Sequence, residues 1–175
     1  MDADVLLVIK MKRGEEEAFD RFVRKYYEEI WNYCRYHCFD SEYAKDLTQE
    51  TFLRFFKNLP EYRCRGKTRN YLYTIAGNLC KNFYKKKKET PIEAEMIEQE
   101  TSSLANPLRN LENSILIEAA LKELSPQLRD VIILHYFQEL KLSEVAEALN
   151  LGLPLVKYRL KSAKKKLEQL IGAYP

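Results

Sequence analysis

The sequence predicts an all-α protein of two small helical domains joined by a flexible acidic linker. Gly and Pro are scarce, five and six among 175 residues, and 46% of the residues are hydrophobic. Apolar positions recur at three- and four-residue steps over long stretches, which is the period of an amphipathic helix. One stretch, residues 89–107, loses this period and is too long for a connection inside one compact domain. It separates a domain over 1–88 from a domain over 108–175.

Four helices are expected in the first domain. A short helix over residues 1–13 ends at Gly14, because glycine commonly follows a helix, and a strong apolar stripe predicts a long helix over 15–38. Asp40 or Ser41 can cap the third helix. A proline, a polar loop and a fourth apolar stripe follow, before a run of lysines closes the domain.

Charge is distributed unevenly along the chain, although the net charge is only +3. Residues 81–88 and 157–166 each hold five Lys, whereas residues 89–101 hold five Glu and no Lys or Arg. Basic clusters attract phosphate backbones without reading sequence, but they also occur as ordinary solvated helix faces. The charge pattern therefore permits nucleic-acid binding without requiring it.

The second domain contains the pattern of a helix-turn-helix. Ser125-Pro126 predicts one helix start, an N-cap followed by proline at the first helical position, and that helix is expected to continue over 127–138. Two more helices are expected at about 142–149 and 153–170, with Asn150 at a tight turn that needs a left-handed backbone. In a helix-turn-helix the second helix enters the major groove. A short antiparallel helix pair imitates this spacing, but the outward hydrogen-bond donors of the second helix favour DNA binding. These donors are Lys157, Tyr158, Arg159, Lys161, Lys164 and Lys165.

Other classes of protein fit the sequence poorly. The longest apolar run near the N-terminus, Val5–Ile9, is too short for a signal peptide or a membrane span, so a cytoplasmic protein without direct membrane insertion is expected. Cys34 and Cys38, with His37, do not amount to four good ligands and have the spacing of a packed helix, so no metal or other cofactor is expected. Two His and no clustered metal-binding carboxylates argue against an enzyme.

Several motifs resemble bacterial sigma factors of the extracytoplasmic-function (ECF) group. LSEVAEALNLGLPLVKYRLK is similar to the helix-turn-helix of sigma region 4, and EYAKDLTQETFLRFF and RNYLYTIAGNLCKNFYKKKK are similar to two segments of sigma region 2. The resemblance covers most of the chain, in the same order and with the linker in the same place. It implies a protein that binds core RNA polymerase and directs promoter-specific transcription initiation. Regions 2 and 4 would then correspond to residues 1–88 and 108–175.

The resemblance also implies roles for individual residues. The helix over 42–56 is expected to grip the largest polymerase subunit, and its matched residues are Asp46, Gln49, Glu50, Leu53 and Arg54. The stretch over 62–84 is expected to capture and open the minus-ten element. Its candidates are Arg63, Arg65, Lys67, Arg69, Asn70, Tyr71, Asn78, Lys81 and Asn82, of which Asn78 and Asn82 are expected to contact bases. Tyr71 either stacks on a base or belongs to the core.

The helix from about residue 153 is expected to read the minus-thirty-five element. Lys157, Tyr158, Lys161 and Ser162 would face the groove, whereas Arg159 and His135 would contact the backbone. This helix departs from the family pattern, because Pro154-Leu155 replaces Gly-Thr and Tyr158 replaces a usual Ser. The base preference of better-matched relatives therefore should not be transferred to it.

The resemblance implies a further partner, an anti-sigma factor that covers these surfaces. The acidic linker is interpreted either as a mimic of nucleic-acid charge in the RNA channel of the polymerase or as a plain tether. An alternative function is that of an operator-binding helix-turn-helix regulator acting without core polymerase, which the segment DLTQETFLRFF does not fit.

Overall fold

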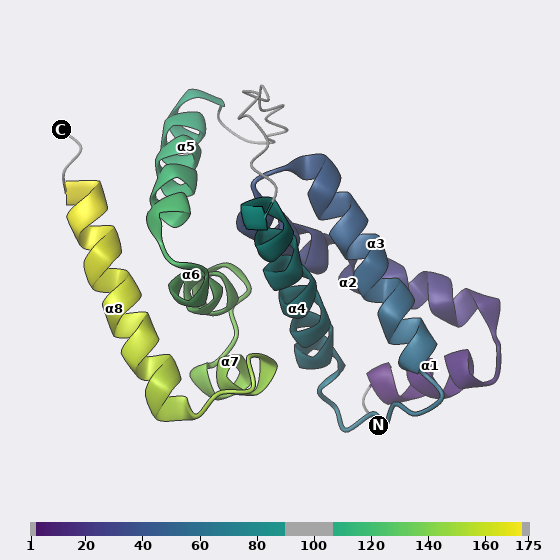
Figure 1. The fold of residues 1–175 in the computed structure, drawn as a ribbon. Helices are drawn as coiled ribbons and strands as arrows, with labels where there is room; N and C mark the ends of the chain where they lie inside the picture. The colour runs from purple at the N-terminus through teal and green to yellow at the C-terminus, as the bar shows by residue number, and fades with distance from the viewer. Residues whose placement is uncertain (1–2, 90–106, 173–175) are drawn as a thin grey trace.

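The computed structural model describes residues 3–89 and 107–172, and every regular element in these two ranges is a helix (Figure 1). The linker hypotheses concern residues that lie mostly outside them. Within the described ranges, no helix is long and apolar enough to cross a membrane.

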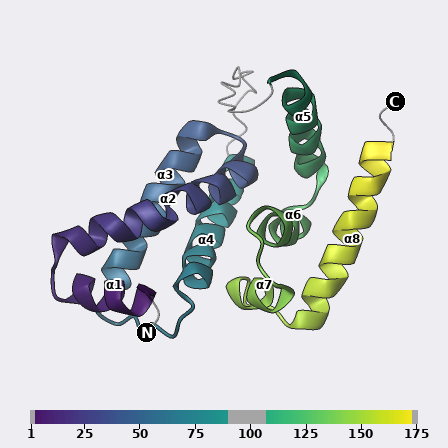
Figure 2. The ribbon, with the colours of Figure 1, turned by 180° about the vertical axis from the view of Figure 1, so that it is seen from behind.

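The N-terminal half of the protein contains four helices. They are α1 (Ala3–Lys12), α2 (Glu16–Cys38), α3 (Ser41–Asn58) and α4 (Thr68–Glu89). The expected all-helical fold is confirmed, and α4 is the central helix of the molecule. Figure 1 shows α2 and α3 on one side of α4 and the C-terminal helices on its other side, and the view from behind in Figure 2 agrees.

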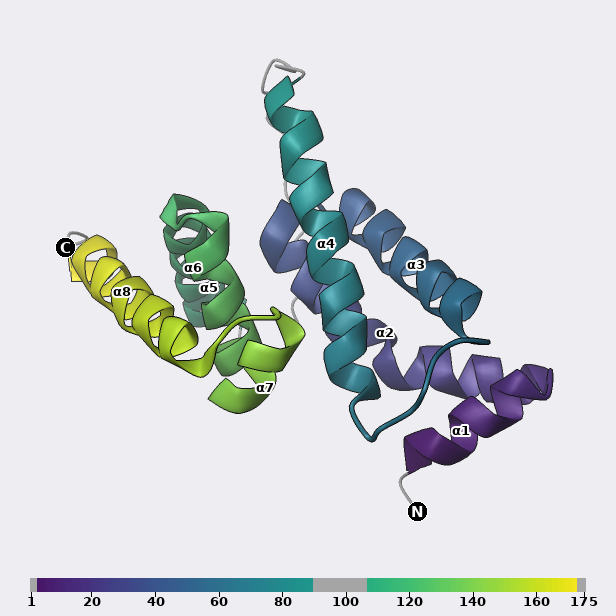
Figure 3. The ribbon, with the colours of Figure 1, turned by 60° about the horizontal axis from the view of Figure 1, so that its bottom comes forward.

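The C-terminal half contains α5 (Pro107–Glu123), α6 (Pro126–Ile132), the π-helical turn η1 (Ile133–Phe137), α7 (Leu142–Ala148) and α8 (Leu153–Gly172). Helices α7 and α8 form the expected helix-turn-helix, and α8 packs along α5 and α6. Figure 3 shows α8 on the outer side of the molecule, away from α4.

The predicted helix ends have the expected chemistry. Gly14 follows α1 with a φ of 82°, and Asn150 takes a left-handed φ of 53° between the two helices of the helix-turn-helix. The side chain of Asp40 accepts hydrogen bonds from two backbone N–H groups of the first turn of α3. The side chain of Ser125 accepts one from the backbone N–H of Leu128. Each of these local signals was readable because it depends on residues close in sequence.

The expectation of one regular helix through residue 138 is wrong. The α-helix changes to a π-helical turn at Ile133, and the N–H of Gln138 donates to the carbonyl of Ile133 at 3.0 Å. Glu139 then adopts a φ of 57°. This wider turn brings Gln138 to α4, where its side-chain oxygen accepts a hydrogen bond from the hydroxyl of Tyr73 at 2.9 Å. A tertiary contact thus replaces the regular continuation of the helix.

The two halves pack against each other, and their apolar cores are continuous. In the N-terminal half the core is largely aromatic, and Phe22 stacks on Phe55 with ring centroids 4.7 Å apart. In the C-terminal half the core is mostly aliphatic, with Val131, Leu134 and Val156 fully buried. Helix α4 packs against α7, and α2 packs against α6 and η1. The predicted domains therefore meet in an extensive interface, which the sequence pattern did not reveal.

Candidate promoter and polymerase interfaces

The helix-turn-helix presents a basic surface on α8. Lys157 and Lys161 are exposed, and Tyr158 is 68% exposed, whereas Val156 is fully buried and fixes the rotation of the helix. A shallow hollow of about 480 Å³ lies beside them, lined by four lysines of α8 with Leu142, Leu160 and Glu168. This face offers cations to phosphates and one aromatic ring to base edges.

The remaining candidates of the second helix are less exposed. Arg159 and Ser162 are half-buried. The ring of His135 is also half-buried, and its Nδ1 atom lies 2.8 Å from the carbonyl oxygen of Leu140. That contact orients the imidazole at the entrance to the helix-turn-helix.

A second hollow lies in the loop between α3 and α4. It has a volume of about 440 Å³ and is lined by Asn58, Glu61, Tyr62, Arg63, Arg65 and Tyr71. The rings of Tyr62 and Tyr71 stack with centroids 5.1 Å apart and planes 15° apart. The hydroxyl of Tyr62 donates to Thr68 at 3.1 Å, and burial raises the pKa of Tyr62. Tyr71 is half-buried, so one ring both lines the hollow and packs on the core.

Lys67, just before α4, and polar residues in the first turn of α4 already have partners. Nζ of Lys67 lies 2.8 Å from Oε1 of Glu147 on α7, and Nδ2 of Asn70 donates to Oε2 of the same carboxylate at 3.2 Å. Arg69 donates to the carbonyl oxygen of Gln138 at 2.8 Å and also pairs with Glu29. Asn78, Lys81 and Asn82 lie further along α4 and are exposed.

A buried polar cluster lies deeper between the halves. The hydroxyl of Tyr33 donates to Asp130 at 2.9 Å, and Nε2 of His37 lies 2.8 Å from the same carboxylate oxygen. Burial alone would raise the pKa of Asp130, but His37 and Tyr33 lower it below the ordinary aspartate value. A Cβ at Gly77 would lie 3.0 Å from the Tyr33 hydroxyl, so glycine leaves room for this cluster beside α4.

Arg129 links several helices at the same interface. Its guanidinium donates to the carbonyl oxygens of Leu121 and Leu124 at the end of α5, at 2.8 and 3.0 Å. It also donates to the carbonyl oxygen of His37 at 3.3 Å and to the hydroxyl of Tyr84. Because the side chain is 4% exposed, these acceptors replace water around a buried cation.

The candidate polymerase residues share the outer face of α3. Leu53 is 63% exposed, which is unusual for a large apolar side chain in the middle of a helix. Asp46, Gln49 and Arg54 are also exposed, and Arg54 donates to Glu50 at 2.7 Å. An apolar centre surrounded by polar groups is typical of a protein-binding surface.

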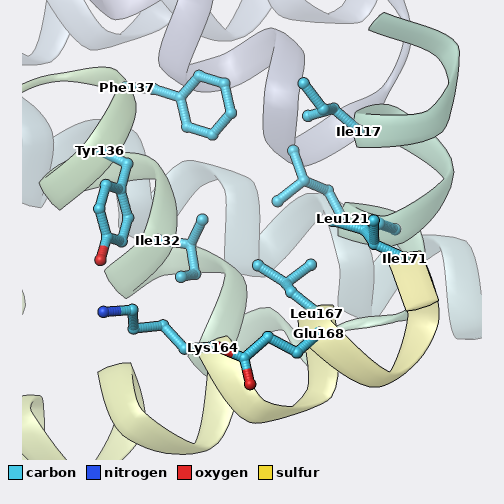
Figure 4. A pocket seen from close by; sticks show the side chains of 10 residues that line it. Ile117, Leu121, Ile132, Tyr136, Phe137, Lys164, Leu167, Glu168 and Ile171 are labelled. Atoms are coloured by element: carbon cyan, nitrogen blue, oxygen red, sulfur yellow. The ribbon is translucent and has the colours of Figure 1, made fainter. Parts of the chain in front are cut away.

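An apolar groove of about 500 Å³ separates α5 from α8 (Figure 4). Side chains of α5, α6 and α8 point toward one another across it, including Ile117, Leu121, Ile132 and Leu167. Tyr136 and Lys164 lie together at one edge, 5.8 Å between the ammonium and the ring centroid. No sequence motif indicated this groove, because its lining comes from four separate elements, α5, α6, η1 and α8.

The cysteine and histidine pair considered in the sequence packs as core. Cys34 and Cys38 are buried, and burial raises the pKa of Cys38 to about 12. His37 faces Asp130 instead of a sulfur atom. Over residues 3–89 and 107–172, no three His, Cys, Asp or Glu side chains are arranged to hold a metal ion.

The structure thus brings the candidate residues together in three places: the outer face of α8, the hollow with the adjacent part of α4, and the outer face of α3. Sequence reasoning missed Tyr62, Asn58 and Glu61 in the hollow, although an aromatic residue between charged ones in a loop is a readable signal. It also missed Arg129, Asp130 and Glu147. Apart from the α5 carbonyls, their partners lie at least 45 positions away along the chain.

These features define an all-helical DNA-binding protein with a helix-turn-helix, a second basic surface and a candidate protein-docking helix. The family model described as Sigma-70 region 2 matches residues 22–90, and the model Sigma-70, region 4 matches residues 114–167.

Known proteins match over nearly the whole chain. The RNA polymerase sigma factor YlaC of Bacillus subtilis (strain 168) is 33% identical over 87% of this chain and 91% of its own length. The ECF RNA polymerase sigma factor SigW of the same organism is 28% identical over 91% of this chain and 92% of its own length. Among solved structures, CnrH in complex with the cytosolic domain of CnrY has the same fold, with a TM-score of 0.77 and 22% identity over 99% of this chain and 100% of that one.

The chain belongs to the ECF group of the sigma-70 family of RNA polymerase sigma factors. It is accordingly a sigma factor, which binds core RNA polymerase and directs transcription initiation at promoters. Sigma factors are regulatory proteins without catalytic activity of their own.

Proposed function

We propose that this sigma factor divides its work among the three surfaces described above. The outer face of α3 binds core polymerase, the hollow and α4 bind the minus-ten element, and α8 binds the minus-thirty-five element. The observation that carries the proposal is the pairing of one basic, aromatic-bearing surface with each matched sigma region. Regions 2 and 4 are assigned to residues 1–88 and 108–175, with 89–107 as the connecting segment.

Core polymerase binds where Leu53 projects from α3. The exposed apolar side chain supplies contact area, and Asp46, Gln49, Glu50 and Arg54 around it set orientation and register. The ion pair between Glu50 and Arg54 keeps both side chains extended on the same face.

The minus-ten element is captured beside the hollow between α3 and α4. Promoter opening exposes unstacked bases, and such bases bind to aromatic surfaces flanked by cations. Tyr62 and Tyr71 supply the aromatic surface, and Arg63 and Arg65 supply the cations. Lys67, Arg69, Asn70, Asn78, Lys81 and Asn82 extend the contact along α4. Asn78 and Asn82 pair with base edges.

The minus-thirty-five element is bound in the major groove by α8. Lys157, Tyr158, Lys161 and Ser162 face the bases, while Arg159 and His135 hold the backbone. Leu155 is 40% exposed where the family carries a hydroxyl, so this position offers DNA an apolar contact instead of a hydrogen bond. The sequence preference should shift accordingly, toward bases with an apolar edge such as thymine.

The chain acts in the cytoplasm, without catalytic activity of its own, and is held inactive by an anti-sigma factor. Structural support for a protein partner comes from CnrH, which was solved with the cytosolic domain of CnrY bound. The apolar groove between α5 and α8 suits the apolar face of a partner helix. The chain uses no cofactor.

Reconstitution with core RNA polymerase tests the proposed function. The chain is mixed with bacterial core enzyme, and run-off transcription is measured on DNA from its own upstream region. We expect a stable complex and a promoter-dependent transcript, which Leu53→Asp abolishes and the matched surface change Leu6→Asp on α1 preserves. Operator binding by the chain alone, with neither complex nor transcript, would support the regulator instead.

A further inference from the structure

The interface between the halves covers part of the surface assigned to the minus-ten element. Two of the assigned residues, Lys67 and Asn70, both bind the carboxylate of Glu147 on α7. In addition, the hydroxyl of Thr74, one turn after Asn70, donates to the carbonyl oxygen of Ala148 at 2.7 Å. Asn70 is only 6% exposed as a result. The first two turns of α4 are therefore occupied by the helix-turn-helix of the same chain.

The bound carboxylate has the chemistry of a nucleic-acid ligand. One oxygen faces an ammonium at 2.8 Å and the other accepts from an amide N–H at 3.2 Å. A phosphate presents negative oxygens to lysines and asparagines in the same manner. The hydrogen bond from Lys67 lowers the pKa of Glu147, so the carboxylate stays charged at neutral pH.

From this geometry we infer that α7 acts as an intramolecular inhibitor of DNA binding, with Glu147 in the place of DNA oxygens on α4. Lys67 and Asn70 cannot bind Glu147 and a promoter strand simultaneously. The buried contacts of Arg129 and Asp130 hold α6 against α2 and α4, and α7 itself packs on α4. The inference rests on the proposed role of Lys67 and Asn70 at the minus-ten element.

The recognition helix α8, unlike α7, is not docked on the N-terminal DNA surface. Lys157, Tyr158 and Lys161 on α8 are exposed while α7 is docked. The inhibition therefore acts on the N-terminal DNA surface and leaves the C-terminal surface accessible. The contact with Glu147 is itself exposed, since the side chains of Lys67 and Glu147 are 59% and 40% accessible, so it opens more readily than the buried cluster beneath it.

A double-mutant cycle on the full chain tests the inference. Binding of a fluorescein-labelled single-stranded DNA of random sequence, roughly twelve nucleotides long, is measured by fluorescence anisotropy. Glu147→Gln should bind about three- to fivefold more tightly than the unmodified chain, because an exposed ion pair no longer competes for Lys67. The gain should disappear in the Lys67→Ala background, since the carboxylate acts through that lysine.

The matched control is Glu123→Gln, which removes an exposed carboxylate from the same half, on α5. An equal gain from Glu123→Gln, or a gain from Glu147→Gln that persists without Lys67, reflects net charge alone and overturns the inference. Absence of any gain from Glu147→Gln also overturns it.

A separate measurement distinguishes failure of the inference from failure of the proposed function. Lys67→Ala is assembled with core polymerase and promoter opening is measured. Reduced opening, together with no gain from Glu147→Gln, means that Lys67 binds promoter DNA but is not inhibited by α7. Unchanged opening means that the role assigned to Lys67 is wrong, and the inference fails with it.

Discussion

The two halves of the protein hold the residues proposed to bind DNA in different states. In the N-terminal half, Lys67 and Asn70 are bound to Glu147 from the other half. In the C-terminal half, Lys157 and Lys161 project from α8 into solvent. Under the proposed assignment, the N-terminal DNA surface requires a rearrangement before it binds DNA and the C-terminal surface does not. The start of α4 would then serve two mutually exclusive partners, α7 and the promoter.

The halves also differ in how they hold together. Rings such as Phe22 and Phe55 fill the N-terminal core, whereas Val131, Leu134 and Val156 are typical of the C-terminal core. Where these continuous cores meet, buried Arg129 and Asp130 form several hydrogen bonds. Apolar contact alone favours association of any orientation, whereas buried polar groups need particular partners. We therefore expect the polar cluster to determine how the halves are oriented.

The largest expected effect is on the stability of this interface. Arg129→Ala removes a buried cation and leaves the carbonyl oxygens of Leu121 and Leu124 without their donor. The free energy of unfolding should fall by about 3 kcal/mol, since each buried acceptor left unsatisfied costs about 1–3 kcal/mol. Urea denaturation measures it. The exposed pair of Arg24 and Asp20 provides a control, and Arg24→Ala should cost less than about 1 kcal/mol. Equal losses from both variants would contradict a special role for Arg129.

The second effect is on binding of core polymerase, which the N-terminal half is proposed to contact through α3. Leu53→Asp places a charge at the apolar centre of the α3 face and should weaken binding to core polymerase about tenfold or more. DNA binding through the α8 surface should not change, since α8 lies apart from α3. Titration of labelled chain with core enzyme gives the affinity. An unchanged affinity would move the polymerase contact away from α3.

The third effect concerns the open DNA surface. Lys161→Ala should weaken binding of the holoenzyme to promoter DNA at low salt and reduce the slope of log affinity against log salt by about 1. If Lys161 contacts only phosphate, all promoter sequences should weaken alike; a change confined to some sequences identifies base contact. No change in the salt slope would exclude Lys161 from the interface.

The smallest effect is a dependence of stability on pH. The folded-state pKa of Asp130 is lowered relative to an unfolded aspartate near about 4. A lowered pKa contributes stability above the unfolded value, and this contribution is lost as pH falls through the folded value. The free energy of unfolding should therefore decline below about pH 4 more steeply in the unmodified protein than in Asp130→Asn. Parallel pH profiles would contradict the lowered pKa.

Sequence analysis predicted the helices well because their signals are local. Gly14, Asp40, Ser125 and Asn150 act on the backbone within a few residues, so each helix end was found close to its place. The π-helical turn was missed because a contact of Gln138 with Tyr73, 65 positions away, stabilises it. Local sequence patterns cannot predict a contact between residues so far apart in the chain.

The candidate sites were predicted unevenly for the same reason. The exposure of Leu53 and Lys157 follows from helical period, and the structure places both on outer faces. The role of each residue remains a prediction. Covering of Asn70 was not foreseen, because Glu147 belongs to a distant helix whose docking depends on the whole interface. Motif resemblance describes what a residue does in the active assembly and says little about its partner in the free chain.

The most direct test of the covered N-terminal surface is the distance between the two halves, measured in the free chain and in the complex with core polymerase. Spin labels are attached through an unnatural amino acid at Glu16 on α2 and Lys166 on α8, two exposed positions, and their separation is measured by pulsed electron resonance. We predict one narrow distribution in the free chain and a clear change in that distance when core polymerase binds. An unchanged distribution in a complex that still opens promoters would contradict the covered state of the N-terminal surface.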